Sequence, residues 1–357
     1  MFAFARAVPI GRREAIPQNR SMGKAIEIAP DLAYIRTSIS NVYFVGNRHA
    51  WVLVDTGVPG YVNDIKAAAA ERFGAESRPH AIVLTHGHFD HAAGALDLAR
   101  HWGVSVYAHP LEFPYLTGVS AYPQKDPTVG GAMAFMSRFF PSRSVNISEV
   151  LQDLPETGEV PGLEGWMAIF TPGHAPGHVS FWREIDGALV GGDVLATADL
   201  DSWYGVISQK RKISRPPSPF TYDWEKARHS VRVVANLKPR VLACGHGEPM
   251  KGPGLGEELD KFAREFAPPS HGRYVAAPAE ANEHGVVYEP PKPPDALPKI
   301  GAGIVAGLFV VAGVFYSRRG KKAAAQIKGG LAAGLRSGFG GALPPLPWFG
   351  RSIHDYE

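Results

Sequence analysis

The sequence predicts an α+β protein in which two β-rich halves pack as two sheets face to face, with helices on the outside. Three observations predict this class. Both halves contain strand-like runs, rich in β-branched and aromatic residues, that are broken by Asn, Gly and Asp. Helix-favouring stretches follow, and each of them precedes an apolar strand of the buried type. The second half then repeats the order of the first.

The first half opens with three short strands joined by tight turns and continues with helices that alternate with strands. Its expected elements are strands at 33–39, 42–47 and 51–57, a helix at 61–73, a strand at 80–86, a helix at 90–102 and a strand at 104–109. The second half is expected to contain strands at 166–172, 178–184 and 187–193, a helix at 222–237 and a strand at 240–246.

Composition divides the chain into one folded domain and flanking segments. Residues 1–21 have a short apolar start but no apolar run of the length that a secretory signal needs, and we expect a flexible leader. The folded domain is expected over 22–267. Within it, 111–150 is an aromatic insertion broken by Pro and Gly. The Pro-rich segment 268–299 is expected to be an extended linker.

Residues 300–317 contain no charge and are followed by a basic cluster. As a helix they span about 27 Å, just enough for a bilayer core of about 30 Å, so a single transmembrane helix is predicted. The alternatives are an oligomerising tail and a helix docked on the domain. The positive-inside rule would place the folded domain outside, but no export signal is visible, so we expect a cytoplasmic domain tethered to the membrane. The tail at 318–357 is basic and Gly-rich, without a readable function.

The charge and the cysteine content exclude several classes of function. The net charge is +3 over 357 residues and the basic residues are spread along the chain, so no nucleic-acid partner is expected. A single cysteine, Cys244, excludes an internal disulfide and fits a reducing compartment. We expect a small-molecule substrate, and the sequence does not indicate an oligomeric state.

The densest cluster of metal-binding residue types is the run THGHFDH. An apolar strand enters a loop there, and Gly87 lets the backbone turn closely. Histidines two apart on an extended segment point the same way, so His86 and His88 can bind one ion. Asp90 and His91 lie where a helix begins and can face a second ion. The alternative interpretation is that Asp90 caps the helix and that the histidines are polar loop residues.

Three more residues of these types stand where an apolar strand runs out into glycine. They are His174 in TPGH, Asp193 in GGD and His246 in GHG. Each histidine taken alone is an ordinary loop residue, but strand ends at one edge of a β-sandwich converge, so the joint pattern predicts one site.

This order of motifs resembles the metallo-β-lactamase superfamily, over residues 24 to about 265. The resemblance implies an αββα sandwich and a site for two metal ions, usually zinc. Carried over residue by residue, it assigns His86, His88 and His174 to the first ion, Asp90, His91 and His246 to the second, and Asp193 to both as a bridge. It also implies that Asp55 supports the site, and it leaves His178 as a supporting or structural residue.

The resemblance implies a hydrolase that contains two Zn²⁺ per chain. A water shared by two cations loses its proton near neutral pH, and the hydroxide attacks an ester-like bond. One ion polarises the substrate carbonyl. Asp90 is the expected catalytic residue, which orients the hydroxide and then carries its proton.

Within the superfamily, the pattern is most similar to glyoxalase II thioesterases and lactonases. His88 departs from the diiron flavoproteins, and Asp193 departs from the commonest antibiotic-hydrolysing members. Quorum-sensing lactonases have a tyrosine where this chain has Ala196, and nothing in the sequence places Tyr204 as its substitute. The alternative from another class is a mononuclear iron oxidoreductase similar to persulfide dioxygenases. A binding module without catalysis is disfavoured by the complete ligand set.

Two segments are candidates for contact with the substrate. The aromatic and Met residues of the insertion either line an apolar mouth or pack the insertion onto the domain. They are Tyr115, Tyr122, Phe135, Met136, Phe139 and Phe140. The basic run at 210–215 either holds an anionic substrate group or is a solvated loop.

Overall fold

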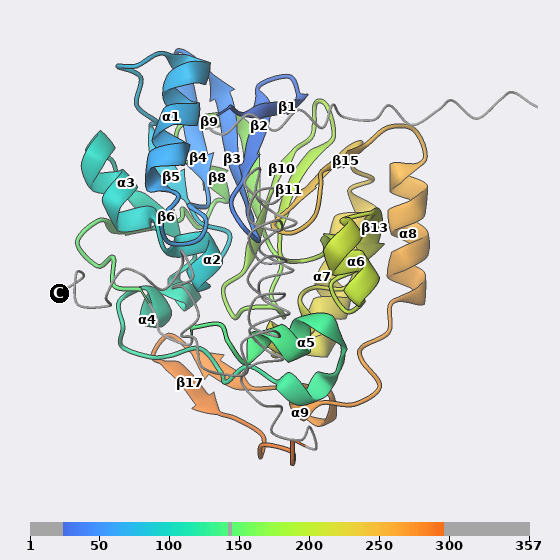
Figure 1. Cartoon of the computed structure of the whole chain (residues 1–357). Coiled ribbons are helices and arrows are strands. Elements are labelled where there is room, and N and C mark those ends of the chain that lie inside the picture. Colours follow the sequence, from blue (N-terminus) through green and yellow to red (C-terminus); the bar gives the residue numbers. More distant parts are fainter. Residues whose placement is uncertain (1–23, 142–144, 296–357) are drawn as a thin grey trace, which may run out of the picture. The chain divides into compact units, whose positions relative to one another are not determined.

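Two β-sheets lie face to face, and helices cover their outer faces (Figure 1). The computed structural model describes residues 24–141 and 145–295. The first sheet has seven strands in chain order: β1 (Ile26–Ala29), β2 (Leu32–Arg36), β3 (Asn41–Asn47), β4 (Ala50–Val54), β5 (Ala81–Val83), β6 (Val106–Ala108) and β7 (Leu151–Asp153). The strands from β1 to β4 pair antiparallel through tight turns. Those from β4 to β7 pair parallel, which requires longer crossover connections.

The second sheet has six strands in the order β15-β14-β11-β10-β9-β8. They are β8 (Glu159–Val160), β9 (Leu163–Phe170), β10 (Val179–Arg183), β11 (Ala188–Gly192), β14 (Val241–Cys244) and β15 (Met250–Lys251). The strands β11 and β14 pair parallel, and the other neighbours pair antiparallel. Two small hairpins are formed by β12 (Ala196–Ala198) with β13 (Arg211–Ser214), and by β16 (Glu280–Asn282) with β17 (Gly285–Tyr288).

The helices fall into those that cover the sheets and those that lie in connections. The helices α1 (Val62–Phe73) and α3 (Ala95–Trp102) cover the first sheet, and α7 (Trp224–Asn236) and α8 (Leu255–Glu265) cover the second. The connections contain α2 (Phe89–Ala92), α4 (Phe113–Leu116), α5 (Gly131–Ser137), α6 (Trp203–Ser208) and α9 (Arg273–Ala276). Short 3₁₀ turns lie at Pro110–Glu112, Pro127–Val129 and Ser218–Phe220.

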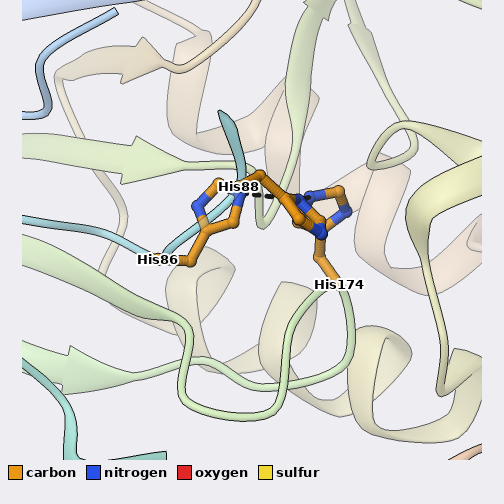
Figure 2. A group of neighbouring side chains, drawn as sticks. All are labelled: His86, His88 and His174. Carbon is orange, nitrogen blue, oxygen red and sulfur yellow. Dashed lines mark hydrogen bonds between the residues drawn. The ribbon is translucent and has the colours of Figure 1, made fainter. Parts of the chain in front are cut away.

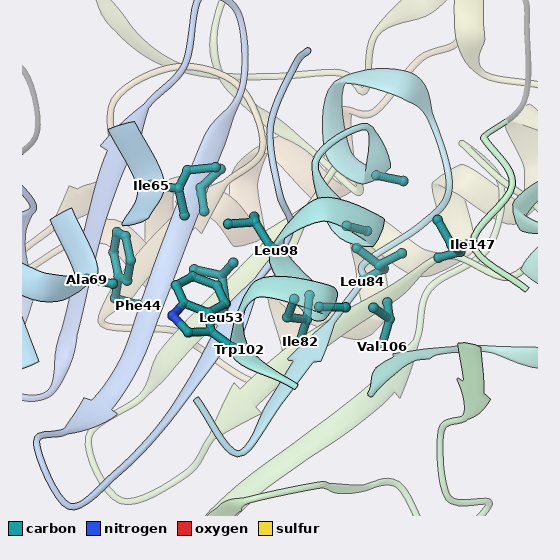
Figure 3. Close-up of a cluster of buried hydrophobic side chains, with 14 of the residues drawn as sticks. Phe44, Leu53, Ile65, Ala69, Ile82, Leu84, Leu98, Trp102, Val106 and Ile147 are labelled. Atoms are coloured by element: carbon teal, nitrogen blue, oxygen red, sulfur yellow. The ribbon is translucent and has the colours of Figure 1, made fainter. Parts of the chain in front are cut away.

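The side chains of β4 point alternately to its two faces, and this explains why the sheet is covered by helices on one face and by the second sheet on the other. Trp51 and Leu53 face the helices α1 and α3, as Figure 3 shows for Leu53 beside Ile65 and Leu98. The alternate residues of the strand belong to the core between the sheets. Successive side chains of a strand point to opposite faces, so an unbroken apolar strand is buried on both sides. The expected αββα layering is present.

The Pro-rich segment is not an extended linker through residue 295, and the expected domain end at residue 267 is wrong. The segment contains α9 and the β16–β17 hairpin, and it packs on the rest of the domain. The backbone N–H of Arg273 donates to Asp126 over 2.5 Å, and the guanidinium of Arg273 pairs with Glu289 at 2.7 Å. The Tyr274 hydroxyl donates to the backbone oxygen of Gln124 over 2.6 Å. These contacts, made by residues that lie between the prolines in the sequence, hold the segment on the domain.

The leader 1–21, the predicted transmembrane helix at 300–317 and the tail 318–357 lie outside the described residues, so each of them stays a prediction. Across 24–141 and 145–295, no helix is both long enough and apolar enough to cross a membrane.

Candidate metal centre

The seven residues predicted as metal ligands come together at one edge of the two sheets. The loop after β5 and the helix α2 carry four of them, and the loops after β9, β11 and β14 carry one each. In chain order they are His86, His88, Asp90, His91, His174, Asp193 and His246, and all seven are buried.

Three histidines form the first group (Figure 2). Nε2 of His86 lies 2.9 Å from Nδ1 of His88, and this Nδ1 lies 3.0 Å from Nε2 of His174. The three nitrogens converge from two loops that are far apart in the sequence. Such an arrangement of imidazole nitrogens can hold one metal ion.

Asp90, His91 and His246 form the second group. Oδ2 of Asp90 lies 3.5 Å from Nε2 of His246 and 3.8 Å from Nε2 of His91. Asp193 stands between the two groups. Its Oδ2 lies 3.0 Å from Nε2 of His246 and 3.3 Å from Nε2 of His174. One carboxylate therefore reaches a nitrogen of each group.

Two buried atoms of the centre have no hydrogen-bond partner. They are Nε2 of His91 and Oδ1 of Asp193, which lie 3.5 Å apart. Orphaned buried polar atoms are rare because they lose their solvation without compensation. Gly245 leaves this spot open, because a Cβ there would come within 2.1 Å of Oδ1 of Asp193. A nitrogen and a carboxylate oxygen left open together fit a metal ion.

The second nitrogen of each histidine is held from outside the centre. Nδ1 of His91 lies 2.8 Å from Oδ2 of Asp55, and Nδ1 of His246 lies 2.8 Å from the backbone oxygen of Ile39. The remaining outer partners are Thr85 for His86 at 3.1 Å, Tyr222 for His88 at 3.3 Å and Thr221 for His174 at 3.3 Å. An acceptor on the outer nitrogen turns the lone pair of the inner nitrogen toward the centre.

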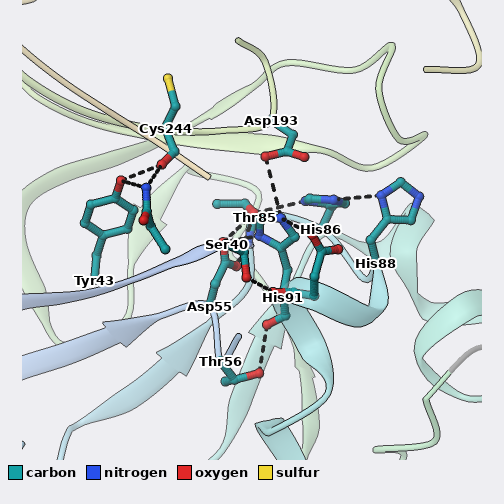
Figure 4. A network of polar contacts seen from close by, with 12 residues as sticks. Ser40, Tyr43, Asp55, Thr56, Thr85, His86, His88, His91, Asp193 and Cys244 are labelled. Carbon is teal, nitrogen blue, oxygen red and sulfur yellow. Dashed lines mark hydrogen bonds and ion pairs between the residues drawn. The ribbon is translucent and has the colours of Figure 1, made fainter. Parts of the chain in front are cut away.

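Asp55 occupies the supporting position that the sequence predicted (Figure 4). Besides His91, it accepts hydrogen bonds from the backbone N–H and the hydroxyl of Thr85, each over 2.8 Å. Hydroxyls hold α2 as well, since Ser40 donates to the backbone oxygen of Asp90 and Thr56 donates to that of His91. These bonds hold the loop after β5 and the helix α2 against the start of β3 and the end of β4.

The resemblance implies a supporting or structural role for His178, and its hydrogen bonds give it a supporting role beside Asp193. Its Nε2 accepts the backbone N–H of Asp193 over 2.8 Å, and its Nδ1 lies 2.9 Å from the hydroxyl of Thr171. Both ring nitrogens are therefore used inside the protein. The bond to the backbone of Asp193 aims the side chain of that residue into the centre.

Burial and charge set the protonation of the centre. Burial lowers the pKa of His88 to about 3 and the pKa values of His86 and His174 well below the usual range. These imidazoles are neutral at pH 7 and keep a lone pair for a cation. Burial also acts on His91, but carboxylates led by Asp193 raise its pKa well above the usual range.

Burial opposes the ionisation of both carboxyl groups at the centre, with different results. It raises the pKa of Asp90. For Asp193, the neighbouring His246 and His91 outweigh burial and hold the pKa well below the usual range. Asp193 is therefore ionised and suited to bind cations, while Asp90 is suited to take up a proton.

Sequence reasoning missed Glu112, a fully buried carboxyl group that joins two ligand-bearing loops. Its Oε2 accepts the backbone N–H of Gly87 over 2.8 Å, and its Oε1 accepts that of Gly177 over 2.6 Å. The Tyr122 hydroxyl also donates to Glu112. A Cβ at Gly177 would lie 2.9 Å from the Glu112 side chain. The only local signal is a single acid within the apolar run PLEFPYL.

A pocket of about 280 Å³ opens onto the centre. Of the six aromatic and Met residues that were candidates either to line it or to pack the insertion, Tyr122 and Phe140 line it. Tyr115 is fully buried and stacks on Tyr122, so it packs the insertion instead. The other three, Phe135, Met136 and Phe139, are not among the residues that line the pocket.

Two further candidates lie away from the pocket. Tyr204 is 70% exposed and does not line the pocket. It therefore does not substitute for the tyrosine that quorum-sensing lactonases have at the position of Ala196. In the basic run, Arg211 pairs with Glu248 at 3.2 Å. The run does not line the pocket, and it is not a loop either, because Arg211–Ser214 forms the strand β13.

Comparisons with known proteins show what the chain is similar to. The Metallo-beta-lactamase superfamily model matches residues 35–246. The probable metallo-hydrolase YflN of Bacillus subtilis is 40% identical over 249 residues, which are 69% of this chain and 94% of that protein. The hydroxyacylglutathione hydrolase of Acidiphilium cryptum is 26% identical over 68% of this chain and 79% of its own length. The solved structure of TTHA1623 in a di-iron-bound form is 24% identical and covers 64% of this chain and 98% of that chain, with a TM-score of 0.43.

Proposed function

Because the chain belongs to the metallo-β-lactamase superfamily and is a metallo-hydrolase, we propose that it holds two zinc ions and cleaves an ester-like bond: a thioester, a lactone or a similar ester. The observation that carries this proposal is the pair of buried ligand groups joined by Asp193. His86, His88 and His174 would hold one ion, Asp90, His91 and His246 the other, and Asp193 both.

Two bound zinc ions would supply an acidified water and a Lewis acid for the substrate carbonyl. Residues of the chain would carry the proton. Asp90 lines the pocket, and its carboxylate would take the proton of the attacking water and return it to the leaving thiolate or alkoxide. Oxygen bonds to the acyl carbon, the bond to sulfur or oxygen breaks, and the proton ends on the leaving group.

The thioester is one named candidate because of the relative called hydroxyacylglutathione hydrolase, whose name describes the hydrolysis of an acyl group on glutathione. The competing function is that of a one-ion iron oxidoreductase. A single ion at the first group would leave Nε2 of His91 and Oδ1 of Asp193 without a hydrogen bond. We therefore favour two ions.

The test is hydrolysis of a thioester, a lactone and an aryl ester before and after metal removal. Treatment with a chelator should abolish turnover, and Zn²⁺ should restore it when about two ions per chain have bound. Hydrolysis that survives complete metal removal would contradict the proposal. So would full activity at one ion per chain.

We also propose that residues 300–317 attach the enzyme to a membrane, with the catalytic domain in the cytoplasm. The uncharged apolar run supports the attachment. The cytoplasmic orientation rests on residues 1–21, whose apolar start is too short for a secretory signal, and it stands against the positive-inside rule, by which the basic residues after 317 favour the opposite orientation. Cell fractionation tests the attachment, and the full-length chain should sediment with membranes. If protease added outside intact cells digests the catalytic domain, the orientation is wrong.

A further inference from the structure

One wall of the pocket in front of the candidate metal centre is aromatic. The rings of Phe89 and Phe140 lie 5.8 Å apart, and those of Phe140 and Phe220 are stacked at 6.2 Å. The Phe220 ring also lies 5.9 Å from the ring of His88. All four residues line the pocket. The wall connects a candidate metal ligand to Phe140 and can pack an apolar part of a substrate.

A lysine is fixed to this wall. Nζ of Lys125 donates a hydrogen bond to the backbone oxygen of Phe140, and Lys125 also lines the pocket. An ammonium group has three N–H donors, so this bond leaves two of them for another acceptor. The side chain is half-buried, and burial lowers the pKa of Lys125.

Lys125 differs from the basic run at 210–215, in which charged residues are paired with carboxylates. In that run, Lys212 pairs with Asp199 at 2.6 Å, and Arg215 pairs with Asp201 at 2.5 Å. Within the described part of the chain, no carboxylate lies at ion-pair distance from Lys125. A half-buried ammonium without a counter-ion gains from an anion that it can reach.

Resting on the hydrolase function proposed above, we propose that Lys125 forms an anion-binding subsite of the pocket. The substrate is then an ester or thioester whose acyl or leaving group carries an anionic end. An apolar segment, packed on Phe140 and Phe220, separates this end from the bond that is cleaved. Lys125 acts on binding and selectivity and takes no part in the chemical step.

The kinetic test compares two aryl esters that differ only at the end of a six-carbon acyl chain. They are 4-nitrophenyl hexanoate, which ends in a methyl group, and the mono-4-nitrophenyl ester of adipic acid, which ends in a carboxylate. The wild type should favour the adipate ester in kcat/KM. Lys125→Met should lower the ratio of the two kcat/KM values about tenfold, the size of one lost charge-assisted hydrogen bond.

Two variants serve as controls. Lys125→Arg keeps the charge and should keep the preference for the adipate ester. Lys212→Met removes an exposed lysine that is already paired with Asp199, and its ratio should equal that of the wild type. A wild type that does not favour the adipate ester, or a Lys125→Met variant that keeps the wild-type ratio, would overturn the subsite.

A binding measurement separates this inference from the proposed function. Calorimetry of the metal-loaded protein with adipate and with hexanoate needs no turnover. Adipate should bind more tightly than hexanoate to the wild type, and Lys125→Met should remove the difference. If that result holds and no ester is hydrolysed, the hydrolase function fails and the subsite stands. Equal binding of the two acids by the wild type refutes the subsite, whatever is hydrolysed.

Discussion

At the scale of single residues, the centre depends on imidazoles that burial keeps neutral and on a carboxylate that its neighbours keep ionised. His86, His88 and His174 are neutral because the protein interior opposes their charge. Asp193 is charged because His246 and His91 lie beside it. Without metal, these three histidines and Asp193 are therefore already in the protonation state that cation binding needs.

Removal of a proposed ligand should lower both bound metal and turnover. His88→Ala and Asp193→Ala each delete a donor atom of the centre, so we expect at least about a hundredfold loss of ester hydrolysis and less than two ions per chain. The measurements are metal analysis and kcat/KM. His229→Ala, at an exposed position of α7, is the control and should behave as the wild type. More than a tenth of the wild-type activity in both ligand variants would contradict the assignment.

Asp90→Asn separates metal binding from proton transfer. An amide oxygen can still approach a cation, but it cannot take up a proton, so the variant should keep at least one ion and lose most of its turnover. Metal content and kcat are compared on the same preparation. Normal turnover in this variant would mean that another group carries the proton.

The stability that His178 contributes should depend on pH. The pKa of His178 is lowered by burial to about 4, against 6.5 in the unfolded chain. Between these values the unfolded chain binds more protons, so the wild type loses stability relative to His178→Asn as the pH falls from 6.5 to 4. The free energy of unfolding of the wild type relative to the variant should fall by about 3 kcal/mol over this window. Denaturant unfolding of metal-free wild type and variant measures it, and a constant difference across the window would contradict it.

The sequence predicted the ligands but not the side chains that hold them. Histidine and aspartate recur at several glycine-rich strand ends, and this joint pattern is unusual enough to be recognised although each residue alone is not. Tyr222, by contrast, is an ordinary tyrosine whose contact with His88 spans 134 positions of the chain. Thr85 and Thr221 are likewise common residue types. Their roles depend on the folded arrangement, which no local pattern encodes.

At the scale of elements, the loops after β5 and β9 must stay in register for three histidines to meet. Glu112 fixes this register because it accepts a backbone N–H from each loop. A buried carboxyl group costs free energy unless its hydrogen bonds compensate, so its three donors indicate a specific positioning role.

Glu112→Gln should weaken one metal site without unfolding the protein. The amide can accept at only one atom, so one of the N–H groups of Gly87 and Gly177 loses its acceptor. We expect about a 10- to 100-fold loss of affinity for one ion, measured by competition with a chelator. Glu149→Gln is the matched control, because Glu149 forms an exposed pair with Arg100 and such pairs contribute little. Unchanged affinity in Glu112→Gln would contradict the positioning role.

The central strands of both sheets follow from their apolar patterns, whereas the short edge strands β1, β7, β8 and β15 were not predicted. Two further element-level predictions needed correction. The expected helix at 90–102 is divided into α2 and α3, because residues 93–94 form a turn and Gly94 lies against the backbone of Thr56. The expected linker from 268 contains α9 and the β16–β17 hairpin instead. The Pro-rich composition favoured an extended linker. The contacts of Arg273 and Tyr274, two residues that lie between the prolines in the sequence, hold the segment on the domain instead.

At the scale of the whole molecule, the domain includes the segment that carries α9 and the last hairpin. A chain that ends at residue 298 keeps this segment and should hydrolyse esters as the full-length chain does, without sedimenting with membranes. A chain that ends at 267 loses the bonds from Arg273 to Asp126 and Glu289. We expect its Tm to fall by about 5 °C or more, since each 1 kcal/mol shifts Tm by about 2–4 °C in a domain of this size.

Calorimetry of the two shortened chains checks the domain boundary. Equal Tm values would mean that residues 268–295 contribute nothing to the stability of the domain. A chain ending at 298 that still sediments with membranes would show that attachment does not depend on 300–317.

The most direct test of the central claim, a two-zinc hydrolase, is metal analysis of the protein purified without added metal. We expect about two zinc ions per chain, with turnover that rises in proportion to zinc occupancy. About one iron per chain, or no bound metal in an active preparation, would contradict it.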